Sequence, residues 1–383
     1  SKSAILTKAV VDTYAKNSDG IYEPVRFVAH FEEDADVTIN YVSADETKGT
    51  VTPGDESLAP ATGNAEGSTA TAKPGYHFVN WTNANNVEVS TDALYTPAKV
   101  DGLNVAATYT ANFAEDADVT INYVSADDTK GTVDPASQTL APATGVAAGS
   151  TATAKPGYRF VNWTNANNVE VSTDALYTPA KVDGLNVAAT YTANFAEDAD
   201  VTINYVSADT TMGTVDPASQ TLAPATGAAA GSTATAKAGY HFTEWTKQSD
   251  SSSVGTTMEY VPGKNADGIY EAETYVAHFA QNDNVTLRYE SEDQNKGAVD
   301  PGTESLAPAT GSAAGSTATA MPGYHFKNWT LESVQNDGSQ TIIDRLNNLI
   351  GTKVSESATL TKAVVDTYAK NSDGIYEPVR FVA

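Results

Sequence analysis

The sequence predicts a mainly β protein built from four tandem repeats, and three observations lead to this prediction. The stretch VTINYVSAD begins at Val37, Val119 and Val201, and the divergent VTLRYESED begins at Val285, at intervals of 82, 82 and 84 residues. One tryptophan recurs at the same intervals. Each repeat contains short alternating Val, Thr and Tyr segments separated by Gly and Pro turns, which is typical of strands.

The intervals divide the chain into domains: repeat 1 (37–118), repeat 2 (119–200), repeat 3 (201–284) and repeat 4 (285–383). Repeats 1 and 2 differ at 9 of 82 positions, all of them before Phe78. Selection on a unique catalytic site would not keep whole surfaces identical, whereas recent duplication of a spacer would. The near-identity therefore favours a structural role.

The two ends of the chain are also nearly the same. Residues 1–29 return as 355–383 at an offset of 354 residues, and only Lys2/Glu356 and Ile5/Thr359 differ. Because this stretch forms the second half of repeat 4, we interpret residues 1–31 as the second half of a preceding repeat. The chain is then one period of a four-repeat unit, plus an overlap, in a longer protein.

The elements of one repeat follow from its local patterns. Alternation predicts a strand over 37–42, and a polar turn follows it up to Gly49. The segment 50–63, which ends in LAPATG, is extended and broken by prolines, so LAPATG is expected to be a turn. A Thr-rich strand, a Pro-Gly turn and an aromatic strand follow over 68–81. A turn at Asp101-Gly102 leads into a closing strand that ends near Phe113.

Repeat 4 contains an insertion. Trp329 lies 44 residues before Asp373, against 20 residues from Trp163 to Asp183. Within the extra length, SQTIIDRLNNLIG predicts a helix over 339–351, with a Ser cap and a Gly stop. We expect this helix to pack on its own sheet; a docking surface is the alternative.

The aromatic cluster GYHFVNW predicts the core of each repeat. Strict alternation places Tyr76 and Phe78 on one face of the strand, and His77, Val79 and Trp81 on the other. A domain of this size needs about this many large side chains to form a core; an exposed platform for stacking carbohydrate is the alternative. The predicted core residues are Tyr76, Phe78, Trp81, Phe113, Tyr158, Phe160, Trp163, Phe195, Tyr240, Phe242, Trp245, Phe279, Tyr324, Phe326 and Trp329.

Acidic residues recur where one repeat meets the next. They alternate along the chain, so they could share a calcium ion, although the spacing and glycine of an EF-hand are absent. A solvated acidic linker is the favoured interpretation, and no cofactor is expected. The calcium candidates are Asp34, Asp36, Asp116, Asp118, Asp198 and Asp200.

Lysines recur before the Asp-Gly turn, at Lys99, Lys181, Lys264 and Lys370. Intramolecular Lys–Asn crosslinks are one use for them. Such crosslinks need burial beside a carboxylate, so solvated loop lysines are the favoured interpretation.

Composition excludes several classes of function. The 22 Lys and Arg against 48 Asp and Glu give a net charge of −26, which repels nucleic acid and anionic lipid. There is no cysteine, so disulfides and thiolate metal sites are excluded. No apolar run is long enough to span a membrane. Catalytic motifs are missing and the five histidines are dispersed, so an enzyme is not expected.

The motif G-Y-x-F-x-x-W followed by Y-T-A-N-F resembles the internalin B-repeat family and the streptococcal high-identity tandem repeats of bacterial surface proteins. The resemblance covers all four repeats and the N-terminal half-repeat, with Ala238 in place of the proline before the glycine in repeat 3. It implies small β-grasp-like (α+β) domains arranged as an elongated rod, located outside the cell, without catalytic residues. The residues that match in repeats 1 and 2 are Gly75, Tyr76, Phe78, Trp81 and Phe113, and Gly157, Tyr158, Phe160, Trp163 and Phe195.

The favoured function is a stalk segment of a bacterial cell-surface adhesin. Its partners are neighbouring repeats of a longer chain, with a host protein or glycan bound by a distal domain. One alternative is a multivalent module whose equal repeats bind a glycan or host protein by avidity. The other is a filament of several copies, because residues 1–29 nearly duplicate 355–383 and could exchange strands.

Overall fold

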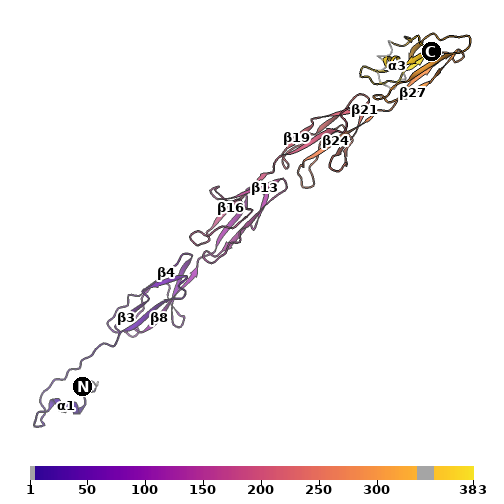
Figure 1. Cartoon of the computed structure of the whole chain (residues 1–383). Coiled ribbons are helices and arrows are strands. Elements are labelled where there is room, and N and C mark those ends of the chain that lie inside the picture. Colours follow the sequence, from indigo (N-terminus) through magenta and orange to yellow (C-terminus); the bar gives the residue numbers. More distant parts are fainter. Residues whose placement is uncertain (1–4, 334–348) are drawn as a thin grey trace. The chain divides into compact units, whose positions relative to one another are not determined.

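The computed structural model describes residues 5–333 and 349–383, and within them four similar sheet units follow one another along the chain. The prediction of a mainly β fold in tandem repeats is confirmed (Figure 1). The helix predicted over 339–351 falls mostly outside the described residues.

The strands of repeats 1 and 2 have closely matching lengths. Those of repeat 1 are β1 (Val37–Ser43), β2 (Gly49–Thr52), β3 (Asp55–Leu58), β4 (Ser68–Ala72), β5 (Tyr76–Asn83), β6 (Glu88–Ser90), β7 (Leu94–Tyr95) and β8 (Ala107–Glu115). Those of repeat 2 are β9 (Val119–Ser125), β10 (Gly131–Asp134), β11 (Ser137–Leu140), β12 (Ser150–Ala154), β13 (Tyr158–Asn165), β14 (Glu170–Ser172), β15 (Leu176–Tyr177) and β16 (Ala189–Glu197).

Repeat 3 follows the same plan, whereas repeat 4 adds a helix. The strands of repeat 3 are β17 (Val201–Ser207), β18 (Gly213–Asp216), β19 (Ser219–Leu222), β20 (Ser232–Ala236), β21 (Tyr240–Lys247), β22 (Ser253–Gly255), β23 (Glu259–Tyr260) and β24 (Glu273–Gln281). Repeat 4 comprises β25 (Val285–Glu290), β26 (Gly297–Asp300), β27 (Thr303–Leu306), β28 (Gly315–Ala320), β29 (Trp329–Ser333), β30 (Lys353–Ser355), β31 (Thr359–Thr361), α3 (Lys362–Ala369) and β32 (Arg380–Val382).

Each repeat contains two sheets. In repeat 1 the larger sheet has the order β3-β1-β8-β5-β6, and the smaller has the order β2-β4-β7. The first and last strands, β1 and β8, are parallel and lie side by side at the centre, while β5 and β3 pair with them antiparallel. Repeats 3 and 4 have the same orders with their own strands. In the described part of repeats 1 and 3 the second layer consists of strands without a helix.

A fully buried tryptophan connects the two sheets of a repeat. Trp81 on β5 packs edge-on against Tyr41 of β1, with ring centroids 5.8 Å apart. Its indole N–H donates to the carbonyl oxygen of Ala93, just before β7 in the smaller sheet, at 3.1 Å. Buried indoles need such a partner. Trp163, Trp245 and Trp329 are equally buried and donate to Ala175, Met258 and Ala358.

The predicted alternation along the aromatic strand is wrong. The pairing of β5 with β8 shifts between Phe78 and Asn80, which marks a β-bulge. A bulge inserts one residue and changes which face the later side chains occupy. Phe78 and Trp81 therefore both face the core, with ring centroids 6.2 Å apart, instead of lying on opposite faces.

The tyrosine of the aromatic motif contributes less to the core than expected. Tyr324 is 52% exposed, and Tyr76 is half-buried near the end of its strand. The first strand of each repeat instead supplies one almost fully buried tyrosine. These tyrosines are Tyr41, Tyr123, Tyr205 and Tyr289, each at most 2% exposed.

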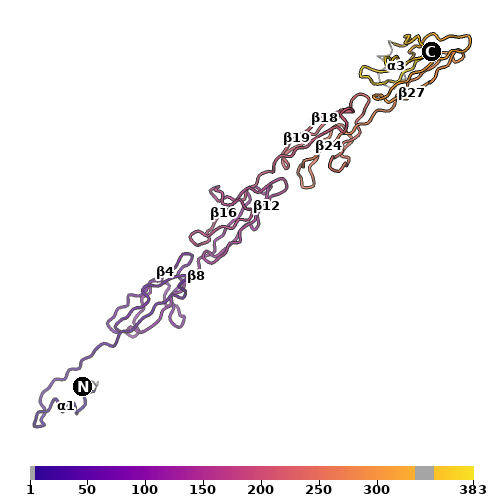
Figure 2. The backbone as a smooth tube through the Cα atoms, in the orientation of Figure 1, coloured from indigo at the N-terminus to yellow at the C-terminus, as the bar shows by residue number. Residues whose placement is uncertain are grey.

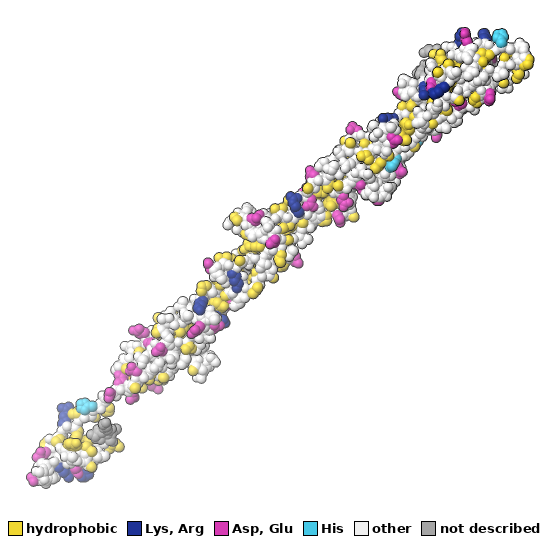
Figure 3. Space-filling view, viewed as in Figure 1, with side chains coloured by type: hydrophobic (Ala, Val, Ile, Leu, Met, Phe, Trp, Pro, Cys, Tyr) yellow, Lys and Arg dark blue, Asp and Glu magenta, His cyan; other side chains and the backbone are white. Residues whose placement is uncertain are grey.

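Residues 5–36 contain one helix, α1 (Lys8–Ala15), and no strand. Figure 2 shows part of the chain between α1 and β1 as an extended backbone trace. Phe31 is 94% exposed and Phe27 is 41% exposed, whereas Phe381, which matches Phe27, is fully buried in repeat 4. The same sequence is therefore packed in one place and uncovered in the other, and Figure 3 shows hydrophobic side chains on the surface of this N-terminal segment.

We expect Trp81→Ala to destabilise repeat 1 by about 3–5 kcal/mol, because it removes a fully buried ring and leaves a cavity. Denaturant unfolding followed by circular dichroism should then show a separate early transition for one repeat. Val79→Ala on the same strand, where the side chain is 41% exposed, is the control and should change stability by less than about 0.5 kcal/mol. Equal effects of the two substitutions would contradict the assignment of Trp81 to the core.

Candidate functional site

The LAPATG segment forms a single tight turn. The amide of Gly63 donates to the carbonyl oxygen of Ala59 at 3.0 Å. The buried Asn104 holds the turn from inside, because its Nδ2 donates to the carbonyl oxygens of Ala59 and Gly63, both at 3.0 Å. The first amides of such a turn have no partner within it. The N–H groups of Ala61 and Thr62 are thus available as donors to another segment.

In repeat 2 the corresponding amides bind a carboxylate of repeat 1. Glu115, the last residue of β8, accepts from the amides of Ala143 and Thr144, both at 2.7 Å. Its second oxygen accepts from the Thr144 hydroxyl at 2.8 Å. Both oxygens of one side chain therefore hold the turn of the next repeat. We call this arrangement the carboxylate clamp.

The clamp recurs at other junctions. Glu33 accepts from the amides of Ala61 and Thr62 at 2.6 and 2.9 Å, and from the Thr62 hydroxyl at 2.8 Å. Glu197 binds Ala225 and Thr226 in the same way, at 2.7–2.8 Å. Where repeat 3 meets repeat 4, the carbonyl oxygen of the Gln281 side chain accepts from the Thr310 hydroxyl at 2.7 Å.

At three junctions a glycine allows the two repeats to approach closely. Gly75 has φ +83°, and a Cβ added there would lie 2.7 Å from Leu185 Cδ2 and 3.0 Å from Ala143 Cβ. A larger residue would be strained and would also push the repeats apart. The equivalent contacts at the next two junctions are Gly157 with Ala225 and Ile269, and Gly239 with Ala309 and Ile375.

The sequence led us to expect that the recurring lysines are solvated. In the structure, three of them instead bind the turn. Lys99 Nζ donates to the carbonyl oxygen of Ala61 at 2.6 Å, and Lys181 Nζ to that of Ala143 at 2.5 Å. Lys264 bonds Ala225 in the same manner. Each lysine therefore binds the same residue whose amide binds the glutamate. In repeat 4, Lys370 lies over the ring of Tyr376, 4.5 Å from its centroid.

The clamp lowers the pKa of its glutamate. At Glu115 the backbone and hydroxyl of Thr144 have the largest effects, and Ala143 and the charge of Lys181 add to them. The pKa of Glu33 and of Glu197 is lowered by the equivalent groups. All of these donors favour the ionised carboxylate, so the clamp is a property of the charged side chain.

The aspartates proposed as calcium ligands have other surroundings. The backbone amide of Asp116 donates to the carbonyl oxygen of Gly75 at 2.9 Å, and its carboxylate lies 3.0 Å from His77 Nδ1. Among the described residues no group of three or more acidic, His or Cys side chains is placed to hold a metal ion. The other candidates also belong to no such group; they are Asp34, Asp36, Asp118, Asp198 and Asp200.

We did not predict the clamp glutamate from the sequence, although it directly precedes one of the calcium-candidate aspartates at each of these junctions. The sequence signal for the clamp was the 82-residue spacing of Glu33, Glu115 and Glu197. Each glutamate lies 28 residues before the first amide that it binds.

In the part of the chain that the structure describes, no helix is long and apolar enough to cross a membrane.

A family model described as a divergent InlB B-repeat domain matches residues 39–117, 121–199, 203–283 and 288–344. No curated protein matches the chain. Two solved structures cover much of it at 10% identity: the N-terminal four Ig domains of Dscam1 isoform 4.44 (91% of this chain, 97% of that one) and cadherin domains 1–5 of protocadherin gamma B2 (86% and 74%). Both have a TM-score of 0.12.

Replacing Glu115 with alanine should loosen the junction between repeats 1 and 2, because it removes all three bonds of the clamp. The chain has no cysteine, so spin labels can be placed on exposed sites by Val87→Cys and Val146→Cys. We expect the label-to-label distance distribution to broaden in Glu115→Ala and to stay narrow in the control Asp118→Ala. An unchanged distribution in Glu115→Ala would show that the clamp does not fix the junction.

The clamp should also weaken in acid. A carboxylate whose pKa is lowered in the clamp contributes its stabilisation above the ordinary glutamate pKa of about 4.3, and that stabilisation is lost as pH falls through the lowered pKa. The same labelled pair should therefore give a constant distribution from neutral pH down to about 4.3, and a broader one below it. Glu115→Gln should remove this step, and a step that persisted would assign it to another group.

Proposed function

The chain belongs to the divergent InlB B-repeat family, and from this premise we propose that it is a stalk segment of a bacterial cell-surface protein. In this role it stands outside the cell and holds a distal binding domain away from the surface. Repeats of this family are typical of extracellular bacterial surface proteins. Repeat number then sets reach, and the junctions set stiffness.

The observation that carries the proposal is the recurrence of one junction. At the Glu115 and Glu197 junctions, a clamp glutamate, a turn whose two amides it binds and a closely approached glycine recur at an interval of 82 residues. A linker that served only to connect domains would need none of these contacts. Hydrogen bonds to a charged group on one side and a tight glycine contact on the other restrict bending about the junction.

Two features of the repeats support a spacer over a multivalent binding module. The tryptophans are fully buried, so they are not available to stack on a sugar. Repeats 1 and 2 are identical from Phe78 to the end of each repeat, as copying of a spacer would produce. We assign no catalytic step to the chain, since the family is one of repeat domains.

The net charge of −26 fits the same role. Like charges on successive repeats repel one another and disfavour folding back of the chain on itself. The clamp works within this field because its donors are neutral amides and a hydroxyl, so it brings no second negative charge to the junction.

Small-angle X-ray scattering tests the proposal. A repeat whose central strand has nine residues spans about 30 Å, so four in line reach roughly 120 Å. We expect a maximum dimension of at least that length after extrapolation to zero concentration. Glu115→Ala combined with Glu197→Ala should make the particle shorter on average and more flexible. A compact wild-type particle would refute the stalk.

A further inference from the structure

Repeat 3 contains a polar cavity beside the loop that connects β23 to β24. The cavity has a volume of about 280 Å³, and side chains from β21, β23 and β24 line it together with the loop. We call it the repeat 3 cavity. The residues on which its chemistry depends are Lys247, Tyr260, Lys264, Tyr270, Glu271 and Glu273.

Lys247, the last residue of β21, faces the interior between the two sheets. It lies opposite the buried Tyr275 of β24, and directly opposite residues share one face of a sheet. The matching residue is Asn83 in repeat 1, and in repeat 4 it is Leu331, which is fully buried. Repeat 3 therefore places a cation where repeat 4 completes an apolar core.

Glu273, the first residue of β24, occupies a second position of this kind. It pairs with the buried Ile203 of β17. Its counterpart is Ala107 in repeat 1, and in repeat 4 it is Val379, which is 2% exposed. A cation and an anion thus stand on neighbouring strands at positions that are neutral in repeats 1 and 4.

Both charged groups retain hydrogen-bonding capacity. Within the part of the chain that the structure describes, the Lys247 ammonium has no hydrogen-bond or ion-pair partner, although its charge lowers the pKa of Asp250. Each Glu273 carboxylate oxygen has one donor, which is the Thr274 amide at 2.8 Å or the Ser249 hydroxyl. An ionised carboxylate oxygen can accept a further bond. The cavity therefore presents free donors beside spare acceptors.

Tyrosine rings provide the apolar part of the lining. Tyr270 occupies the position of Asn104 in repeat 1, since the amide of each donates to the proline carbonyl of its LAPATG turn. The Tyr270 hydroxyl accepts from the amide of Ala229 at 3.2 Å, and Lys264 Nζ lies 5.4 Å from the ring centroid. Tyr260 and Tyr270 are both half-buried, so part of each ring is accessible from the cavity.

The chemistry of the lining indicates an uncharged ligand that carries hydroxyl groups. Two lysines, Lys247 and Lys264, stand against two glutamates, Glu271 and Glu273, so the charges cancel in a chain that is otherwise strongly acidic. A site whose charges cancel favours a ligand without net charge. A hydroxyl both donates and accepts, so adjacent hydroxyls of a sugar can accept from the ammonium and donate to the carboxylate. Tyrosine rings supply the apolar surface on which a sugar ring packs.

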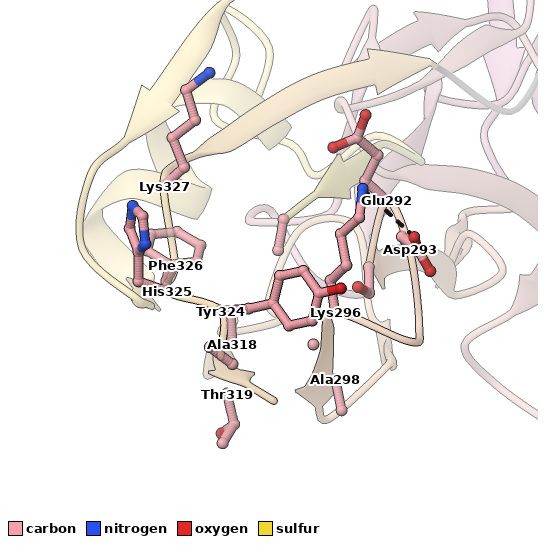
Figure 4. A pocket seen from close by; sticks show the side chains of 14 residues that line it. Glu292, Asp293, Lys296, Ala298, Ala318, Thr319, Tyr324, His325, Phe326 and Lys327 are labelled. Carbon is pink, nitrogen blue, oxygen red and sulfur yellow. Dashed lines mark ion pairs between the residues drawn. The ribbon is translucent and has the colours of Figure 1, made fainter. Parts of the chain in front are cut away.

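Repeat 4 has a different pocket, with a volume of about 200 Å³. Lys296 lines it, and its ammonium lies 3.4 Å from the Asp293 carboxylate (Figure 4). Figure 4 shows Lys327 pointing away from Tyr324. Neither lysine therefore offers a free ammonium inside that pocket.

We propose that the repeat 3 cavity binds one neutral sugar unit of a glycan. The sugar hydroxyls accept from Lys247 and donate to Glu273, while the sugar ring packs on Tyr270. Pockets for drug-sized ligands have volumes of about 300–1,000 Å³, so this cavity is suited to a single sugar ring. The site adds a ligand to the stalk at one repeat, and it does not depend on the stalk proposal.

Saturation-transfer NMR on the full chain tests the site. The probes are the methyl glycosides of glucose, galactose, mannose and N-acetylglucosamine, with N-acetylneuraminic acid as an anionic comparison and glycine as a zwitterionic one. We expect at least one neutral glycoside to bind with a millimolar Kd and both comparisons to fail. Binding of a comparison alone, or of no glycoside, would overturn the proposal.

Substitutions that introduce the residues of repeat 1 locate the binding. Lys247→Asn and Glu273→Ala should each weaken it at least about tenfold, because each removes a hydrogen bond to a charged group. Repeat 1 folds with these residues at the same positions, so the fold should be kept. Glu259→Leu is the control, because Glu259 is exposed outside the lining and repeat 1 has leucine there. Equal affinities in all three variants would place the sugar elsewhere and refute the assignment.

Competition with the bound glycoside separates two sources of the sugar. Displacement by purified peptidoglycan would support a glycan of the bacterial wall, and displacement by mucin would support a glycan of a host surface. Displacement by neither would overturn the assignment of the site to a glycan.

Discussion

Each repeat depends on one indole buried between two small sheets. A domain of about 82 residues buries a limited apolar area, so a single large ring contributes a large share of its core. Trp81 also has an N–H that must be satisfied, and the Ala93 carbonyl satisfies it from the edge of the smaller sheet. The strand that carries Trp81 pairs with β8 through to Tyr76 opposite Glu115. The position of the clamp is thus set by the strand that builds the core.

The clamp holds neighbouring repeats in contact although both carry an acidic surface. The acidic surface would drive neighbouring repeats apart, and a cation bridging the junction aspartates is the obvious remedy. The structure instead uses a carboxylate against two amides and a hydroxyl, with Lys181 bound to the carbonyl of Ala143. A turn held by Asn186 keeps these amides pointed outward. The junction is therefore built from groups that the chain itself supplies.

The sequence was sufficient to predict the repeats, the strands and the buried tryptophans, because periodicity and large apolar residues report directly on burial. It did not predict the bulge at Phe78, since alternation assumes an unbroken register and only pairing with β8 reveals the extra residue. The clamp was missed for a similar reason. Glu115 looks like one more charge in an acidic linker until Ala143, 28 residues later, is brought beside it by folding. Sequence spacing can suggest such a pair, but tertiary structure defines it.

The junction between repeats 3 and 4 shows which part of the joint is constant. Gln281 replaces the glutamate, and Tyr376 replaces the asparagine that holds the turn. Even so, the Tyr376 amide donates to the Pro308 carbonyl at 3.0 Å, as the Asn104 amide does to that of Pro60 at 2.8 Å. The contact of Gly239 with Ala309 persists as well. Backbone geometry and the close glycine contact are thus retained while the charge is lost. Because glutamine does not titrate, the acid step expected from the clamp glutamate is absent at Gln281.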